Sequence, residues 1–203
     1  MNPRRPPVGR VPSRGESPEG AKESWVETTL GRFCGNRGQS VLPANTPDRQ
    51  FELYSVPSFP DGKPEIVPGK AIGSNKQLVD SQSVLLCRIN PRINRAWVVG
   101  NFTPHTKIAS TEWIVFPPTD EVVPDFLCYF LQQHAVRDFL AHNASGVGGS
   151  LMRVKPSTLR DFPFAYPQPG EQRRIVAEIE KQFTRLEAGV AALRRVQANL
   201  KRY

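Results

Sequence analysis

The sequence predicts a mixed α/β (α+β) globular domain followed by a long C-terminal coiled-coil helix. Three observations predict this fold class. Clusters of β-branched and aromatic residues separated by turn residues fill the middle of the chain, apolar residues at helical spacing follow Pro124, and a heptad pattern occupies the C-terminal segment. A length of 203 residues fits one domain with an appendage, or two small domains.

The N-terminal segment has a composition that opposes folding. It carries five Pro and four Arg within its first 18 residues and almost nothing to bury. We therefore expect residues 1–23 to be a disordered, basic, Pro/Arg-rich tail, with contact to DNA as an open alternative. The globular domain is expected over 24–170 and the helix over 171–203, and residues 1–80 otherwise suggest only short strands broken by turns.

The stretch "SVLLCRINPRINRAWVVGNF" predicts two strands joined by an exposed basic loop, because apolar clusters flank the polar, Pro-containing "NPRINR". The following "TKIASTEWIVFPP" predicts another strand, with Trp113 and Phe116 in the core. From Pro124 the apolar spacing becomes helical and predicts one amphipathic helix of about 17 residues. Glycines at 146, 148 and 149 then predict a flexible loop.

The C-terminal helix shows apolar residues at alternating spacings of three and four, which is the pattern of a coiled-coil seam. An amphipathic helix lying on its own domain is the alternative, but the length and regularity favour a coiled coil and therefore a homodimer. The predicted dimerisation residues, which we call the seam, are Val176, Ile179, Phe183, Leu186, Val190, Leu193 and Leu200.

Charge is distributed unevenly along the chain, whose net charge is +8. Residues 81–111 and 139–160 contain basic side chains and no acid, whereas the acids from Glu112 to Asp138 lie between them. This separation predicts a basic face and an acidic face. Arg and Asn suit base edges in DNA, although most Arg-rich loops are merely solvated. The candidate DNA-binding residues are Arg88, Asn90, Arg92, Asn94, Arg95, Lys107, Ser150, Arg153 and Lys155.

Catalytic and metal-binding patterns are not indicated. The three cysteines form no CxxC pair, the three histidines are scattered, and "SGVGGS" lacks the Gly-Lys-Ser/Thr of a phosphate-binding loop. We therefore expect no metal, no cofactor and no catalytic residue. No apolar run reaches the roughly 18 residues of a membrane span and the start lacks the core of a signal peptide, so a cytoplasmic location away from membranes is expected.

Several stretches together resemble the specificity subunit of type I restriction-modification systems. They are "SVLLCRINPR", "IASTEWIVFPP", "PDFLCYFLQ" and "GVGGSLMRVKPSTLRDFPFAYPQPGEQRRIVAEIEKQF". The resemblance implies a target recognition domain that reads one half of a split DNA site, and a conserved spacer helix. A full subunit has two such units whose helices pair antiparallel, so this chain resembles a half subunit.

The resemblance also implies partners: double-stranded DNA, a modification (methyltransferase) subunit and a restriction subunit. In this family those two subunits bind S-adenosylmethionine and ATP, and no residue here matches either site. The chain is thus expected to be non-catalytic. Two alternatives are a coiled-coil assembly module whose globular domain binds protein, and a fragment of a fused restriction enzyme. A preference for one short DNA sequence would separate the first of them from DNA recognition.

Overall fold

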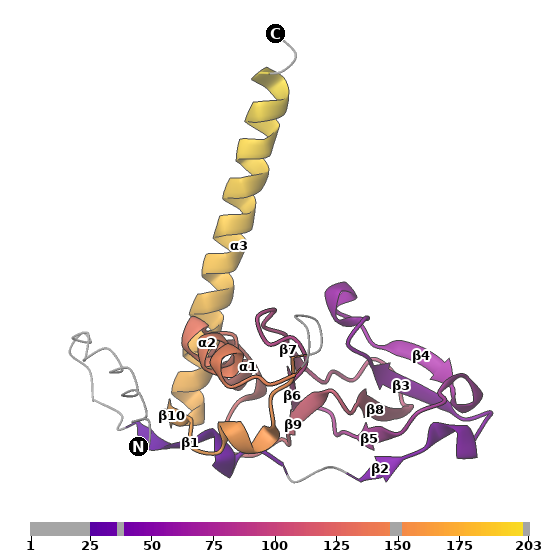
Figure 1. Cartoon of the computed structure of the whole chain (residues 1–203). Helices are drawn as coiled ribbons and strands as arrows, with labels where there is room; N and C mark the ends of the chain where they lie inside the picture. Colours follow the sequence, from indigo (N-terminus) through magenta and orange to yellow (C-terminus); the bar gives the residue numbers. More distant parts are fainter. Residues whose placement is uncertain (1–24, 36–38, 147–151, 201–203) are drawn as a thin grey trace.

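The computed structural model describes residues 25–35, 39–146 and 152–200, so the predicted N-terminal tail lies outside the described residues. A domain of small sheets and two short helices occupies one end of the molecule. A single 32-residue helix, α3 (Pro169–Leu200), projects from it (Figure 1). The predicted fold class, a mixed α/β domain with a long C-terminal helix, is confirmed.

The first sheet is built mainly from the N-terminal half of the chain. Its strands are short because turn residues interrupt the sequence, as expected for residues 1–80. Strand order is β2-β5-β8-β3-β4, and only β3 and β8 run parallel. The strands are β2 (Ser40–Val41), β3 (Gln50–Tyr54), β4 (Glu65–Pro68), β5 (Lys76–Leu78) and β8 (Thr106–Ser110).

The second sheet has the order β7-β6-β9, and all its pairs are antiparallel. Strands β6 (Val84–Cys87) and β7 (Ala96–Val98) are the two strands predicted around the basic loop. The stretch predicted as one further strand forms two instead, β8 and then β9 (Trp113–Phe116) in different sheets. The side-chain amide of Gln77 donates to the carbonyl oxygens of Ser110 and Trp113, at 2.9 and 2.8 Å, and thereby fixes the bend between them.

The single helix predicted after Pro124 is divided into α1 (Pro124–Leu131) and α2 (His134–His142). The prediction of one helix of about 17 residues was therefore wrong. Gln133 is extended, with ψ of 149°, and the amide of Asn94 donates to the Leu131 carbonyl at 2.8 Å. That bond satisfies a carbonyl which a continuing helix would need for itself.

Three hydrophobic cores hold the described part of the domain together around these elements. The larger core lies between the second sheet, both short helices and a small sheet of β1 (Val26–Thr29) with β10 (Pro163–Tyr166). A second core joins the two larger sheets through Tyr54, Trp97 and Trp113, and the indole N–H of Trp113 donates to the Tyr54 carbonyl at 3.0 Å. A third, small core includes Phe51 and Ile108 of the first sheet. Trp113 and Phe116 are buried, at 3% and 0% exposed, as predicted.

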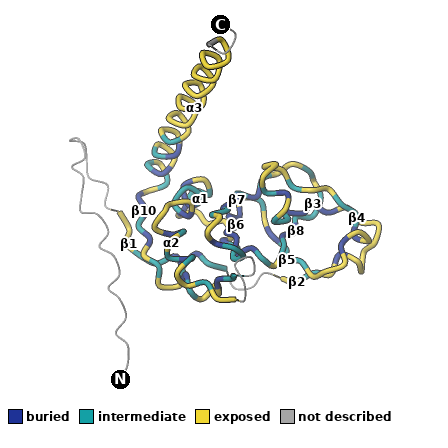
Figure 2. Tube along the Cα trace, turned by 45° about the horizontal axis from the view of Figure 1, so that its top comes forward, coloured by how far each residue is buried: buried dark blue, intermediate teal, exposed yellow. Residues whose placement is uncertain are grey.

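The base of α3 belongs to the larger core, whereas the rest of the helix is exposed (Figure 2). Gln172 is fully buried at the first turn and Val176 is 8% exposed. The last contact is a stacked pair of rings, Tyr129 and Phe183, with centroids 6.1 Å apart. Among the described helices, none is both long and apolar enough to cross a membrane.

Candidate nucleic-acid interface

The two acid-free windows of the sequence meet at one place in the fold. The β6–β7 loop, residues 88–95, lies beside residues 152–155. The Asn90 N–H donates to the Met152 carbonyl at 2.8 Å, and the Val154 N–H donates to the Arg88 carbonyl at 2.9 Å. Ile89 and Arg153 form an isolated antiparallel bridge. Main-chain bonds therefore join the two basic segments into one surface.

The β6–β7 loop turns at Asn90, whose φ is 48°. Asn tolerates this left-handed conformation better than most residues, and Pro91 then restricts the next φ. The Ile93 N–H donates to the Asn90 carbonyl at 3.0 Å and closes the turn. Arg92 and Ile93 are consequently exposed at the tip of the loop.

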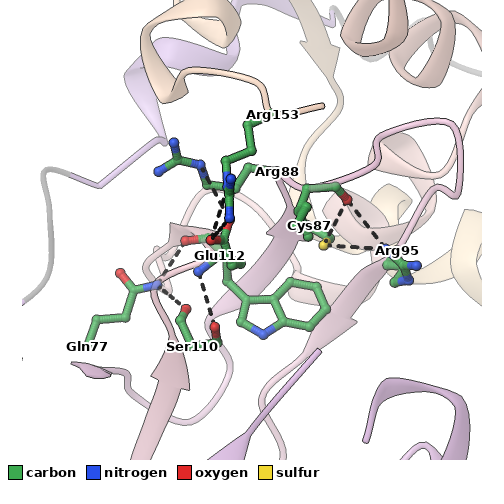
Figure 3. A network of polar contacts seen from close by, with 9 residues as sticks. Gln77, Cys87, Arg88, Arg95, Ser110, Glu112 and Arg153 are labelled. Carbon is green, nitrogen blue, oxygen red and sulfur yellow. Dashed lines mark hydrogen bonds and ion pairs between the residues drawn. The ribbon is translucent and has the colours of Figure 1, made fainter. Parts of the chain in front are cut away.

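Two arginines of this surface share one carboxylate, as Figure 3 shows. Arg153 donates from Nε to both Glu112 oxygens at 3.1 Å and from Nη2 to Oε1 at 2.9 Å. Nε of Arg88 lies 4.0 Å from Oε2. We call Arg88, Glu112 and Arg153 the Arg–Glu–Arg cluster. The hydrogen bonds that Arg153 donates to Glu112 raise the pKa of Arg153 above its ordinary value, so that guanidinium stays charged.

Glu112 was missed as a site residue, because it was grouped with the acids that follow it in the sequence and was expected on an acidic face. That assignment was wrong for Glu112, which lies within the basic surface. The bend between β8 and β9 carries it there, and the Arg88 N–H donates to its carbonyl at 2.9 Å. Glu112 lies within the stretch predicted as one strand, and the bend that divides it into β8 and β9 leaves no clear mark in the sequence.

The remaining candidate residues of the two segments differ in whether their side chains face solvent or bond within the protein. Arg92 and, on the second segment, Lys155 are exposed. The side chains of Asn94 and Arg95 bond within the protein instead. Asn94 donates to the Leu131 carbonyl at the end of α1, and Nη1 of Arg95 donates to the Ile89 carbonyl at 3.4 Å and to the Cys87 sulfur at 3.6 Å. These two residues shape the loop, and Arg92 and Lys155 extend its charge to solvent.

The structure does not bring Lys107 to this surface, and Ser150 lies outside the described residues. Lys107 is on β8 with a side chain only 9% exposed, and its ammonium lies 3.5 Å from the buried Glu52 carboxylate. Burial alone would raise the pKa of Glu52, but hydrogen bonds from Tyr54 and Thr103 and the charge of Lys107 lower it overall. Lys107 therefore belongs to a buried network inside the first sheet.

The outer seam of α3 forms a second candidate surface. Val176 is packed into the domain and Ile179 is half-buried. The next four seam residues are all exposed: Phe183 is 51% exposed, Leu186 62%, Val190 39% and Leu193 71%. Val196, which was not predicted, is 55% exposed beside them, and the side chain of Leu200 lies outside the described residues.

Reactive chemistry is not evident in the described part of the chain. No group of three or more His, Cys, Asp or Glu side chains there could hold a metal ion. Cys34, Cys87 and Cys128 are free, and burial raises the pKa of each thiol, to about 12 for Cys128. A thiol with so high a pKa is a poor nucleophile at neutral pH, because the thiolate is the reactive form.

No protein-family model matches the chain, and no curated protein matches it in sequence. Solved structures do match. The HsdS subunit from Thermoanaerobacter tengcongensis is 21% identical, with a TM-score of 0.69 over 91% of this chain and 47% of that one. A structure from work on complex assembly and conformational transition of the type I R-M system is 22% identical, with a TM-score of 0.66 over 90% and 47%.

The type I restriction-modification S subunit from M. genitalium is also similar, at 15% identity, with a TM-score of 0.50 over 83% of this chain and 41% of that one. The chain thus spans about half the length of the solved structures that it matches. The match includes most of both the domain and the helix, since it extends over nine-tenths of the chain in two cases. The chain therefore has the fold of about half of an S subunit of the type I systems.

Proposed function

We propose that this chain recognises one half of a split double-stranded DNA site as a half specificity subunit of a type I restriction-modification complex. The observation that carries the proposal is the fold, which over nine-tenths of the chain is that of the type I S subunits. The joined basic segments support it, because they place the side chains of Arg92, Arg153 and Lys155 on one surface. Lys and Arg give salt-dependent affinity for phosphates, and side chains that reach base edges give specificity.

The chain itself performs no chemistry in this proposal. Modification and restriction belong to separate partner subunits, which the S subunit positions on the DNA. The complex would work on intracellular DNA, which places the chain in the cytoplasm.

The exposed seam of α3 supports pairing with the helix of a second copy. The chain spans about half of its structural neighbours, so two copies would supply two recognition domains. The four exposed seam residues from Phe183 to Leu193 recur at coiled-coil spacing, and a partner helix would remove them from water. An isologous antiparallel pair would give a symmetric reader with its two domains held apart.

A selection from random DNA duplexes tests the proposal, with the full chain alone and with a modification subunit of the type I systems present. We expect one short preferred half-site. Arg92→Ala is expected to reduce that preference. Lys155 is an exposed cation on the second segment, so Lys155→Ala is expected to weaken binding to all sequences alike and to reduce the salt slope, the slope of log affinity against log salt concentration, by about one.

Exposed Lys63 lies on the loop before β4 and belongs to neither basic segment, and Lys63→Ala serves as the matched control. Binding of all duplexes alike would contradict the proposal. If the chain binds all duplexes alike but forms dimers through α3, a coiled-coil assembly module becomes the better description of its function.

A further inference from the structure

The Arg–Glu–Arg cluster suggests what one position of the half-site contains. Its carboxylate binds one defined edge of the Arg153 guanidinium, formed by Nε and Nη2, through three contacts of 2.9–3.1 Å. A guanidinium has five N–H donors. Those that remain are both donors of Nη1 and one of Nη2, and one donor of each nitrogen points past the end of the side chain. Glu112 therefore leaves Arg153 with one two-donor fork.

The fork is held at the surface rather than inside the protein. The Arg153 side chain is 42% exposed and that of Glu112 is 27% exposed. Both ends of the contact are anchored: the main chain of Arg153 bonds to Ser145 in both directions at 2.9 and 3.0 Å, and the bend that carries Glu112 is fixed by Gln77. Holding a long side chain in advance reduces the entropy lost when a ligand binds.

We propose that Glu112 positions Arg153 to read a guanine in the major groove of the half-site; this inference rests on the proposed function. Two parallel donors match the two acceptors of guanine, O6 and N7. Adenine presents one acceptor and one donor on the same edge, which a two-donor fork does not match. Arg153 is thus a specificity-determining residue, and Glu112 is a positioning residue that acts through it.

Charge favours a base over a phosphate as the ligand of this fork. A phosphate bound by Arg153 would lie close to the Glu112 carboxylate, and two negative charges at that distance repel each other. The edge of guanine carries no net charge and does not meet this penalty. An exposed cation without a described acidic partner, such as Lys155, is better placed for the phosphates.

The test compares the full chain with Arg153→Lys and Glu112→Gln in the same duplex selection. Lys keeps the charge but loses the fork, and Gln keeps the shape of Glu but loses its charge. We expect the preference for guanine at one position to fall about tenfold to hundredfold in Arg153→Lys and by a smaller factor in Glu112→Gln. Preferences at the other positions should be unchanged.

The matched control is Glu121→Gln, which changes another Arg–Glu pair outside the basic surface. Its carboxylate binds Arg32 at 2.7 and 2.8 Å, and both side chains are half-exposed. This variant should keep the guanine preference. A urea unfolding curve of each variant shows whether the fold is retained.

A modified base adds a readout that a merely structural ion pair would not move. Replacing the selected guanine by 7-deazaguanine removes the N7 acceptor. The unaltered chain should bind the modified duplex more weakly than the unmodified one, whereas Arg153→Lys should bind the two duplexes with nearly equal affinity. Equal losses in both proteins would overturn the inference.

The other outcomes separate the two proposals. If the unaltered chain prefers no sequence, the proposed function fails, and this inference fails with it. If the chain is sequence-specific but both variants keep the guanine preference, the ion pair is structural and only this inference is overturned. If the variants weaken every duplex equally and reduce the salt slope, Arg153 contacts a phosphate and the inference is again overturned.

Discussion

The two ends of α3 carry the same heptad pattern but meet different surroundings. At the base, Val176 is packed into the core of the domain, whereas Val190, two heptads later at the same heptad position, is 39% exposed. The pattern alone does not tell these positions apart, because an apolar residue at a seam position predicts burial without naming the partner. The difference shows that one continuous repeat can be packed into a domain at one end and exposed at the other.

Polar contacts separate the two ends even more clearly. The side chain of Gln172 accepts from the Val123 N–H at 2.7 Å and donates to the carbonyls of Glu121 and Pro167 at 2.8 and 2.7 Å. Gln182, ten residues later, is exposed and donates only to Glu178, one turn away on the same helix. The base of α3 is therefore bonded into the domain, and its outer part is not.

The largest expected effect comes from removing the buried amide at the base. Gln172→Leu leaves three main-chain groups without their partner, and each such group costs about 1–3 kcal/mol. We expect the free energy of unfolding, measured with urea, to fall by about 4 kcal/mol. Gln182→Leu is the matched control and should change it by less than about 0.5 kcal/mol. Similar losses from the two variants would remove the distinction between base and outer helix.

The next effect concerns association rather than folding. Leu186→Asp places a charge in the exposed part of the seam and should cost several kcal/mol of dimerisation free energy, about 3 or more. The urea unfolding of the domain should be unchanged. Sedimentation at tens of micromolar measures the dimer, with Ala188→Asp on the opposite side of the helix as the control. A dimer that survives Leu186→Asp intact, or a monomer in the unaltered chain, would contradict the assigned seam.

A pair of identical truncations compares the two ends directly. Val176→Ala opens a small cavity in the core, and we expect it to lower the free energy of unfolding by about 2 kcal/mol. Val190→Ala removes the same atoms from an exposed position. It should change the free energy of unfolding of the domain by less than about 0.5 kcal/mol and should weaken the proposed dimer. Measuring both under monomeric conditions isolates the contribution of the domain. An equal loss at Val190 would mean that the outer helix also packs on its own domain.

The smallest expected effect lies at the edge of the base. Glu121 pairs with Arg32 and accepts from the Tyr166 hydroxyl at 2.6 Å, but it remains half-exposed. Exposed ion pairs contribute little, so Glu121→Gln should lower the free energy of unfolding by about 0.5 kcal/mol, and by less at high salt. Thermal unfolding at two salt concentrations measures this. A loss as large as that of Gln172→Leu would mean that the ion pair, rather than Gln172, holds α3 to the domain.

Local patterns in the sequence predicted much of this fold. The apolar clusters on both sides of "NPRINR" predicted β6 and β7, and the period of the last segment predicted α3, because both signals are written in neighbouring residues. The predicted helix after Pro124 was too long because its break depends on Asn94, a residue 30 positions before Pro124. Only the folded chain brings that amide to the Leu131 carbonyl.

The candidate site depended even more on contacts between distant residues. The basic segments were recognised as acid-free windows, but their joining through Asn90 and Met152 is a main-chain contact that no side chain encodes. Glu112 joined Arg153 across 41 positions, and Lys107 turned inward to Glu52, although its sequence neighbourhood resembled that of the loop arginines. Charge distribution along a chain predicts which residues are polar, and topology decides which of them meet.

The joining of the two basic segments also has a consequence for how such a surface can change over evolutionary time. Main-chain atoms connect Asn90 to Met152 and Arg88 to Val154, so most side chains on the two segments are compatible with these bonds, with Pro excluded at positions 90 and 154 because it lacks the N–H donor. Exposed positions such as Arg92 and Ile93 can therefore be exchanged without dismantling the frame that presents them. Asn90 is the exception, because its left-handed backbone restricts replacements to Gly, Asp and a few others. Under the proposed function, a few substitutions at the tip would change the DNA preference of a lineage and leave the scaffold intact.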